Sequence, residues 1–279
     1  MIIDCRCRPP TKELLPFFKS AFNDRVLRRG AQFERPTSVI QESEELFWQE
    51  FQEAGITYGV VCFRNTPGLP FGQVPNEHVA QLVARYPEKL IGIAAIDPSN
   101  QLHDAQREIE RSIKVLGLRG VAMEPGVVKP SMMYNDQRLY PIYELCTQLD
   151  VPIFLLTGPW SGYRLDHTNP ITIEDVARDF PKLDIVCAHA CWPYVMEMIG
   201  VALRRRNIYV QPDGFNFRAG GNVLMEAAND MLQDQYLFSS GYPGAPMKAI
   251  VEAYNKFPLT YRDKIMYHNA QRVLRLDKK

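Results

Sequence analysis

The chain has 279 residues, of which 46% are hydrophobic, so it can bury the core of one barrel or of two ordinary domains. Its 32 lysine and arginine residues balance 32 aspartate and glutamate residues, which gives no electrostatic support for binding to nucleic acid or to a membrane surface. The six cysteines form no CxxC pair, so we expect reduced, buried thiols in a cytoplasmic protein. We expect no signal peptide and no membrane span, because no apolar run reaches the ~18 residues that a spanning helix needs.

The first predicted strand covers residues 2–8 and stops at two prolines, which cannot continue the ladder of a sheet. Side chains two positions apart in a strand share a face, so Asp4, Arg6 and Arg8 point one way and the cysteines between them point the other way. Two guanidinium groups held ~7 Å apart inside a closed sheet would repel each other unless an anion lay beside them. The segment therefore indicates either an internal anion site or an edge strand with both arginines in solvent.

The rest of the chain alternates between strand and helix patterns. After a mixed, basic segment at 11–35, seven further strands are predicted at 56–64, 90–96, 117–124, 151–157, 183–189, 207–211 and 236–240. Helices are predicted at 43–54, 77–86, 101–116, 136–149, 171–180, 194–204 and 223–232, and two more, 247–256 and 261–276, close the chain.

This alternation predicts the fold class α/β, as a single (β/α)8 TIM barrel, regular or distorted, over residues 1–279 with an extra C-terminal helix. The main alternative is an open doubly wound sheet. The first strand is not followed by a glycine-rich phosphate-binding turn, which weakens a nucleotide-binding version of that alternative.

A closed barrel has one working face, where the strands end and the loops to the helices begin. The residues at these predicted strand ends form the site hypothesis: Arg6, Arg8, Arg64, Asp97, Glu124, Leu156-Thr157, His189 with Cys191-Trp192, Gln211 with Asp213, and Ser239-Ser240-Gly241-Tyr242. Those assigned a role are Arg6, Arg8, Arg64, Glu124, His189, Trp192, Asp213 and Tyr242.

Six segments support a family assignment: Ile3-Asp4 and the runs at 116–121, 151–158, 180–189, 237–243 and 269–274. With these segments in this order, the chain resembles the amidohydrolase superfamily. The similarity is to the amidohydrolase-related branch that includes decarboxylases of aromatic and muconate-type acids and lactonases of dicarboxylates. The resemblance implies the barrel fold and a homo-oligomer.

The departures from the family pattern concern the metal site. Where the family has two metal-binding histidines on its first strand, this chain has Arg6 and Arg8; Leu156 and Gly241 stand where the family has a histidine and the metal-binding aspartate. Only His189 still matches. A catalytic zinc site uses about three protein ligands, and a guanidinium repels a cation, so we expect no catalytic metal and no cofactor. A thiolate site is disfavoured because both cysteines of the first strand are expected to face the helices.

The remaining site residues have proposed roles and open alternatives. Arg6 and Arg8 would bind a carboxylate or stabilise an oxyanion in place of a metal. His189 is the candidate general acid or base, although a neutral histidine hydrogen-bonded in the core is the alternative. Glu124 is a counter-ion to the arginines or a second acid or base. Arg64 is assigned to substrate binding.

Three further candidates follow the last strands. Asp213 is assigned to substrate binding, but could equally lie at the surface. Trp192 and Tyr242 could wall a pocket for a flat or unsaturated substrate, although aromatic residues near a barrel rim are often plain packing.

Three functions remain open. The first is a metal-independent, lactonase-like hydrolase of a small carboxylated molecule, in which the arginine pair binds the anion and His189 moves a proton. The second is a decarboxylase of a small acid. The third is a barrel that lost its chemistry and binds a metabolite or a partner. The expected ligand is a small anionic substrate in each enzymatic case.

Overall fold

The computed structural model describes residues 1–12, 14–15, 33–66, 73–99 and 102–277. Within these ranges, seven parallel strands pair in sequence order. They are β1 (Ile3–Asp4), β2 (Tyr58–Cys62), β3 (Leu90–Ala95), β4 (Val121–Met123), β5 (Ile153–Leu156), β6 (Ile185–Ala188) and β7 (Ile208–Gln211). Most of the segment predicted at 11–35 lies outside the described residues.

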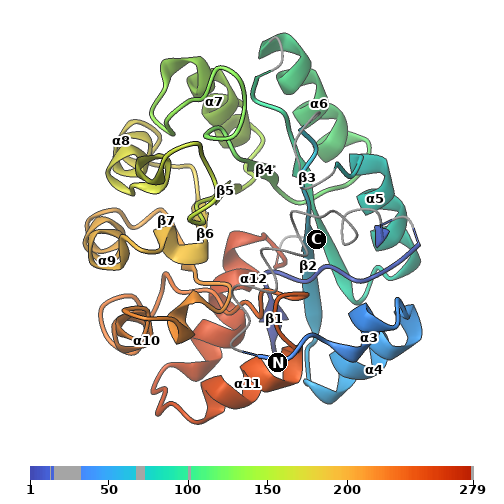
Figure 1. Cartoon of the computed structure of the whole chain (residues 1–279). Helices are drawn as coiled ribbons and strands as arrows, with labels where there is room; N and C mark the ends of the chain where they lie inside the picture. The colour runs from blue at the N-terminus through green and yellow to red at the C-terminus, as the bar shows by residue number, and fades with distance from the viewer. Residues whose placement is uncertain (13, 16–32, 67–72, 100–101, 278–279) are drawn as a thin grey trace.

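Helices follow the strands and surround the sheet (Figure 1). They are α3 (Thr37–Ile40), α4 (Glu44–Glu53), α5 (Asn76–Arg85), α6 (Leu102–Lys114), α7 (Tyr140–Gln148), α8 (Ile171–Asp179), α9 (Val195–Arg204), α10 (Val223–Ala228), α11 (Met247–Asn255) and α12 (Asn269–Val273). A π-helical turn, η5 (Lys264–His268), leads into α12. The predicted α/β barrel is confirmed.

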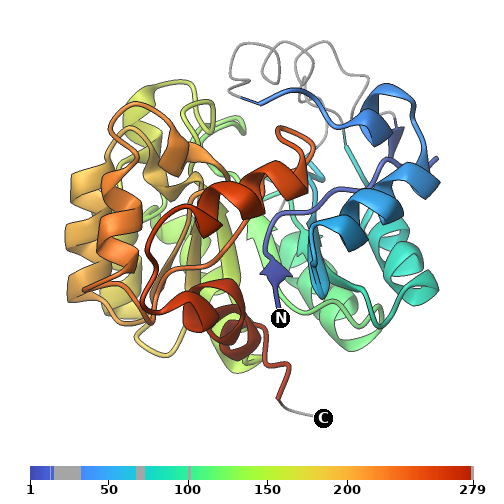
Figure 2. The same ribbon diagram turned by 90° about the horizontal axis from the view of Figure 1, so that it is seen from below.

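One or two apolar side chains from each strand, and one from the 236–240 segment, fill the centre of the barrel. This interior cluster includes Ile3, Val60, Ile93, Ala122, Phe154, Val186, Tyr209 and Leu237. Apolar residues of η5 and α12 belong to the same cluster and cover one end of the barrel, where both termini of the described chain also lie (Figure 2). The opposite end, where the strands finish, is left for polar side chains.

The predicted eighth strand at 236–240 closes the sheet without forming a regular ladder. On one side Val210 donates its N–H to the carbonyl of Gln235 at 2.7 Å, and Leu237 donates to the carbonyl of Val210 at 2.9 Å. On the other side Cys5 donates to the carbonyl of Phe238 at 3.0 Å. The segment therefore joins β7 to the start of the chain through a few bonds.

A bend at Cys5 interrupts the strict alternation predicted for the first strand. The Cys5 side chain packs in the interior cluster, whereas Cys7 packs in the helix-facing core, with its Sγ 4.0 Å from Met247 Sδ. The prediction that both thiols face the helices is therefore wrong for Cys5 and right for Cys7. All six cysteines are buried and free of disulfides, as predicted.

No helix in the described part of the chain is both long enough and apolar enough to cross a membrane.

Candidate active site

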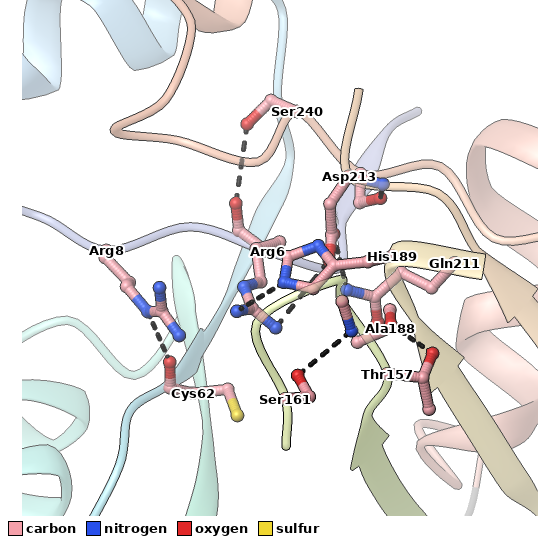
Figure 3. Close-up of polar contacts among 12 residues, drawn as sticks. Arg6, Arg8, Cys62, Thr157, Ser161, Ala188, His189, Gln211, Asp213 and Ser240 are labelled. Carbon is pink, nitrogen blue, oxygen red and sulfur yellow. Dashed lines mark hydrogen bonds and ion pairs between the residues drawn. The ribbon is translucent and has the colours of Figure 1, made fainter. Parts of the chain in front are cut away.

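Three charged or titratable side chains meet at the mouth of the barrel (Figure 3). His189 begins the turn that follows β6, Asp213 follows β7, and Arg6 follows β1. His189 Nδ1 lies 2.9 Å from Asp213 Oδ2, and its Nε2 lies 3.4 Å from Arg6 Nη2. Arg6 Nη1 lies 3.6 Å from the same Asp213 oxygen, Oδ2. Since the Asp213 side chain is only 1% exposed and that of His189 is 18% exposed, the imidazole is the member that solvent or a ligand can reach.

The Asp213 carboxylate is held ionised by its surroundings. Burial by itself would raise its pKa, but Arg6 and His189 outweigh that effect and hold the pKa of Asp213 well below its ordinary value. Gln211 Nε2 donates to Oδ1 at 2.6 Å, and the backbone N–H of Asp213 donates to Ser239 Oγ at 2.9 Å. The carboxylate is thus fixed in position as well as in charge.

The His189 imidazole is neutral at physiological pH, because burial lowers its pKa, although Asp213 opposes this effect. The geometry indicates its tautomer. Nδ1 faces a carboxylate and therefore carries the proton, while Nε2 faces a guanidinium N–H of Arg6 and accepts from it. A histidine held this way has one nitrogen available to exchange a proton with a ligand.

Unusual backbone geometry places His189. Three consecutive non-glycine residues, His189, Ala190 and Cys191, have φ of 68°, 51° and 53°, in the left-handed region. Such residues each cost about 1 kcal/mol or more and persist only where the surroundings enforce them. Here Thr157 Oγ1 accepts the N–H of Cys191 at 3.0 Å and donates to the carbonyl of Ala188 at 2.6 Å, which holds the turn against β5.

Two glycines allow the chain to approach the His189–Asp213 pair closely. A Cβ on Gly158 would lie 2.5 Å from Cδ2 of His189, and a Cβ on Gly241 would lie 2.7 Å from the carbonyl oxygen of Asp213. Gly241 also has φ of 71°, which a side chain would disfavour. Gly241 therefore serves close packing beside Asp213.

Arg8 and the Arg64–Glu124 pair extend the charged cluster. Arg8 is buried, its Nε donates to the carbonyl of Cys62 at 2.6 Å, and its guanidinium lies 5.4 Å from the centre of the Phe63 ring. Burial and the nearby Arg6 and Arg64 lower the pKa of Arg8, so three guanidinium groups share this region. Both arginines of the first segment lie inside the protein, which argues against the edge-strand alternative.

Glu124 forms a two-point ion pair with Arg64. Arg64 Nε lies 2.5 Å from Oε2, and Nη2 lies 3.3 Å from Oε1. Burial raises the pKa of Glu124, but Arg64 outweighs this and leaves it below the ordinary value. A carboxylate ionised in this way is a poor proton donor, so the geometry favours the counter-ion interpretation over the catalytic one.

The other assigned residues occupy different positions. Asp213 orients His189 and is buried, so the surface alternative for it is wrong. Tyr242 is fully buried in the helix-facing core, where its hydroxyl lies 2.6 Å from Ser38 Oγ and its ring packs on Phe47; the predicted role as a pocket wall is wrong. Trp192 is half-buried and donates its indole N–H to the carbonyl of Ala219 at 3.1 Å.

Sequence reasoning missed Phe215, the first residue of the 3-10 turn η4 (Phe215–Phe217). Its ring centroid lies 5.2 Å from that of His189 and 5.6 Å from that of Trp192. Phe215 is therefore the aromatic residue that covers the imidazole, and it contributes to the burial that keeps His189 neutral. The only available signal was its position two residues after Asp213.

The residues present do not fit a divalent metal ion. Arg6 lies against the His189 nitrogen that Asp213 does not engage, and a guanidinium stays protonated and repels a cation. Leu156, at the end of β5, offers no ligand. Across the described ranges, no three or more His, Cys, Asp or Glu side chains gather in a way that could hold a metal.

A family model described as Amidohydrolase matches residues 4–276. An uncharacterized TIM-barrel protein from Bordetella bronchiseptica is 35% identical with a TM-score of 0.92, over 100% of this chain and 99% of that one. A dihydroxybenzoic acid decarboxylase from Polaromonas sp. JS666, solved with bound manganese and an inhibitor, 2-nitroresorcinol, is 19% identical with a TM-score of 0.69, over 100% of this chain and 98% of that one; it shows the fold alone. A 2-amino-3-carboxymuconate-6-semialdehyde decarboxylase from Dictyostelium discoideum is 32% identical over 92 residues, which are 33% of this chain and only 24% of that protein. Because the family model matches residues 4–276, nearly the whole of this chain, the chain belongs to the amidohydrolase family.

Proposed function

We propose that this protein is a metal-independent decarboxylase of a small carboxylated acid. The observation that carries the proposal is the contact of His189 with Arg6 on one nitrogen and Asp213 on the other. This arrangement supplies a permanent cation for an anion and a proton carrier beside it. Substrate, reaction and metal independence are all part of the proposal.

The guanidinium groups bind and orient the substrate. Arg6 and Arg8 would hold a carboxylate by charge-assisted hydrogen bonds, and Arg64, fixed by Glu124, adds positive potential nearby. Asp213 and Glu124 are ionised, and the positive charges of Arg6, Arg8 and Arg64 outnumber these two negative charges. An anion therefore enters favourably.

The proton step falls to His189. Binding of an anion raises the pKa of the imidazole, so that His189 becomes protonated on Nε2 by solvent while Asp213 stabilises the imidazolium. The bond between the carboxylate carbon and its neighbour then breaks. The electron pair stays on that neighbour, which takes the proton from Nε2, and CO2 leaves. Loss of this proton returns His189 to the neutral imidazole, and solvent protonates it again when the next anion binds, so protons and charge balance.

The comparisons support decarboxylation over hydrolysis. The two relatives named above with an activity are both decarboxylases, although one is similar only in fold and the other over a short stretch. Lactone hydrolysis remains the second candidate, because His189 is held in the neutral form in which Nε2 could instead deprotonate an attacking water.

The test is the release of labelled CO2 from a panel of carboxyl-labelled aromatic and unsaturated acids, with and without a strong chelator. We expect CO2 release that persists in chelator and is lost in His189→Asn. Release that requires added Mn2+ would refute metal independence. Ring opening of lactones with oxygen-18 from water, and without CO2, would favour the hydrolase. Binding without turnover of either substrate class would favour the inactive barrel.

A further inference from the structure

Apart from the His189–Asp213 pair, a serine and a histidine meet between the loops that follow β4 and β5. Ser131 Oγ lies 2.5 Å from Nε2 of His167, within hydrogen-bond distance. Ser131 belongs to the loop after β4, and His167 belongs to the 3-10 turn η2 (Leu165–Thr168) that follows β5. The pair is therefore carried by two strands that differ from β6 and β7, which carry His189 and Asp213.

The surroundings of His167 indicate which of its nitrogens carries a proton. Nδ1 lies 3.1 Å from the carbonyl oxygen of Arg164, which can only accept, so Nδ1 carries hydrogen and Nε2 holds the lone pair of the neutral ring. Asp166 Oδ1 lies 3.6 Å from Nδ1, although its other oxygen is 2.7 Å from Nη2 of Arg164. A carbonyl and a carboxylate therefore face the nitrogen opposite Ser131, which is the arrangement that orients a general base.

The Ser131 hydroxyl faces two acceptors. Its oxygen lies 2.7 Å from the carbonyl oxygen of Gly126 and 2.5 Å from Nε2 of His167. Because a hydroxyl has one hydrogen, a neutral imidazole competes with the carbonyl for that proton. In a protonated ring Nε2 donates to Oγ instead, and Ser131 then has no base. The neutral ring is the form that can activate the serine, so its reactivity should rise with pH.

Two glycines make room for the imidazole between the loops. A Cβ on Gly126 would lie 3.0 Å from Cβ of His167, and a Cβ on Gly162 would overlap that same atom. The two glycines also pair with each other in an isolated parallel bridge. His167 is buried, whereas Ser131 is half-buried, so a small molecule can approach the serine while the base is shielded from water.

The geometry points to Ser131 as the nucleophile of a second reactive site, with His167 as its general base and an ester as its substrate. Oγ forms a bond to the acyl carbon while its proton moves to Nε2. The bond between that carbon and the alcohol oxygen breaks, and Nε2 gives the proton to the departing alkoxide. Water then attacks the acyl-serine and gives a proton to Nε2, the carboxylic acid leaves, and the proton returns to Oγ. The proposed decarboxylation uses neither residue.

The first test is covalent labelling with diisopropyl fluorophosphate, followed by peptide mass spectrometry. We expect the label at Ser131, and we expect labelling to be at least about 10-fold slower at pH 5 than at pH 8 and in His167→Gln than in the wild type. The internal control is Ser99, an exposed serine whose hydroxyl donates to Asp97 at 2.6 Å; it should stay unlabelled. An unlabelled Ser131, or equal labelling of Ser131 in His167→Gln, would overturn the inference.

A thiol at the same position gives a second readout. All six native cysteines are buried, so a thiol introduced by Ser131→Cys reacts against a low background. An adjacent imidazole favours the thiolate, so we expect iodoacetamide at pH 7 to alkylate Ser131→Cys at least about 10-fold faster than Ser99→Cys, although position 99 is more exposed. Adding His167→Gln should remove this advantage. A rate no higher than that of Ser99→Cys would overturn the inference and identify the Ser131–His167 contact as a bond that only joins two loops.

Turnover is tested with 4-nitrophenyl acetate. The wild type should release 4-nitrophenol at least about 10-fold faster than Ser131→Ala, and acetylated Ser131 should be found by mass spectrometry early in the reaction. Equal release by the two proteins would overturn the assignment of ester hydrolysis. This ester releases no CO2, so its hydrolysis leaves the decarboxylase proposal to its own test.

Discussion

His189 and Asp213 face each other across the ends of two neighbouring strands, with Nδ1 of the imidazole 2.9 Å from Oδ2 of the carboxylate. The contact orients the ring so that Nε2 turns towards Arg6. An isolated histidine at this position would be free to rotate, and neither its tautomer nor its proton-exchanging atom would be defined. The carboxylate therefore determines which nitrogen is left to exchange a proton with a ligand.

Asp213→Asn should lower kcat by roughly 10²- to 10⁴-fold, because an amide no longer stabilises the imidazolium. It should also lower the pKa of His189 further, since the carboxylate that raises it is gone. Steady-state CO2 release across a pH series measures both effects. Asp234→Asn, a partly exposed surface change, is the control. A variant with normal kcat would show that Asp213 does not orient the proton carrier.

Gly158→Ala should place a methyl group against the imidazole, because the added Cβ would lie 2.5 Å from Cδ2 of His189. A catalytic group displaced by about 1 Å can lose up to about 100-fold in rate, so we expect kcat to fall by about 10- to 100-fold. The control is Gly200→Ala in α9, where nothing lies within 4 Å of the new Cβ and the helix should gain about 0.5–1 kcal/mol. Equal kinetics in the two variants would contradict the close packing at His189.

The pH profile of kcat/KM distinguishes an acid from a base at His189. Burial lowers the pKa of His189 below 6.5 in the free enzyme. A decarboxylase that needs the protonated ring should therefore lose kcat/KM as pH rises through that lowered pKa, whereas a hydrolase that needs the neutral ring should gain activity over the same range. A profile that is flat between pH 4 and 8 would exclude His189 from both roles.

Asp4 should make the protein less stable as pH rises. Burial raises the pKa of Asp4 from its ordinary 3.8 to about 7, although hydrogen bonds from Ser240 and Arg6 oppose the shift. The folded state therefore binds this proton more tightly than the unfolded state, so the stabilisation is present below pH 4 and is lost as pH rises to 7. The difference corresponds to roughly 4 kcal/mol at most.

Asp4→Asn removes this titration and keeps a side chain that can accept from the Ser240 N–H. We expect the free energy of unfolding in urea to fall between pH 5 and pH 8 in the wild type by more than in the variant. Other titrating groups are shared by both proteins and cancel in the comparison. Parallel pH dependence would show that the hydrogen bonds of Ser240 at 2.8 and 2.5 Å keep Asp4 ionised throughout.

The barrel could be predicted because its signals are local: short apolar runs, turn residues and intervening helices repeat along the chain. The strand ends then place His189 and Arg6 at one mouth. The bend at Cys5 could not be predicted, since alternation assumes an unbroken strand. For the same reason Tyr242 was misplaced, because its segment leaves the ladder after a single bridge to β7 and turns its ring into the outer core.

The role of Asp213 also lay beyond the sequence. Asp213 has φ of 51°, in the left-handed region, and its carbonyl oxygen lies where a side chain on Gly241 would collide with it. The amino-acid composition of the two loops does not predict such a contact. The sequence also could not predict that buried amide atoms of Gln211 and Asn216 lack a hydrogen-bond partner among the described residues, because pairing of polar atoms is a property of the folded chain.

The closure between the first and last segments has a consequence for motion. Here the sheet is joined by the Cys5–Phe238 bond and by the carboxylate of Asp4 holding Ser240, whereas β5 and β6 share a full ladder. Few hydrogen bonds need to break for this junction, the seam between the first segment and the 236–240 segment, to open. Amide protons along the seam should therefore exchange with solvent sooner than those of β5 and β6. Arg6 and Asp213 are attached to opposite edges of the seam, and each opening would separate them. Transient local opening of the barrel would thus break the Arg6–Asp213 contact without unfolding the rest of the molecule.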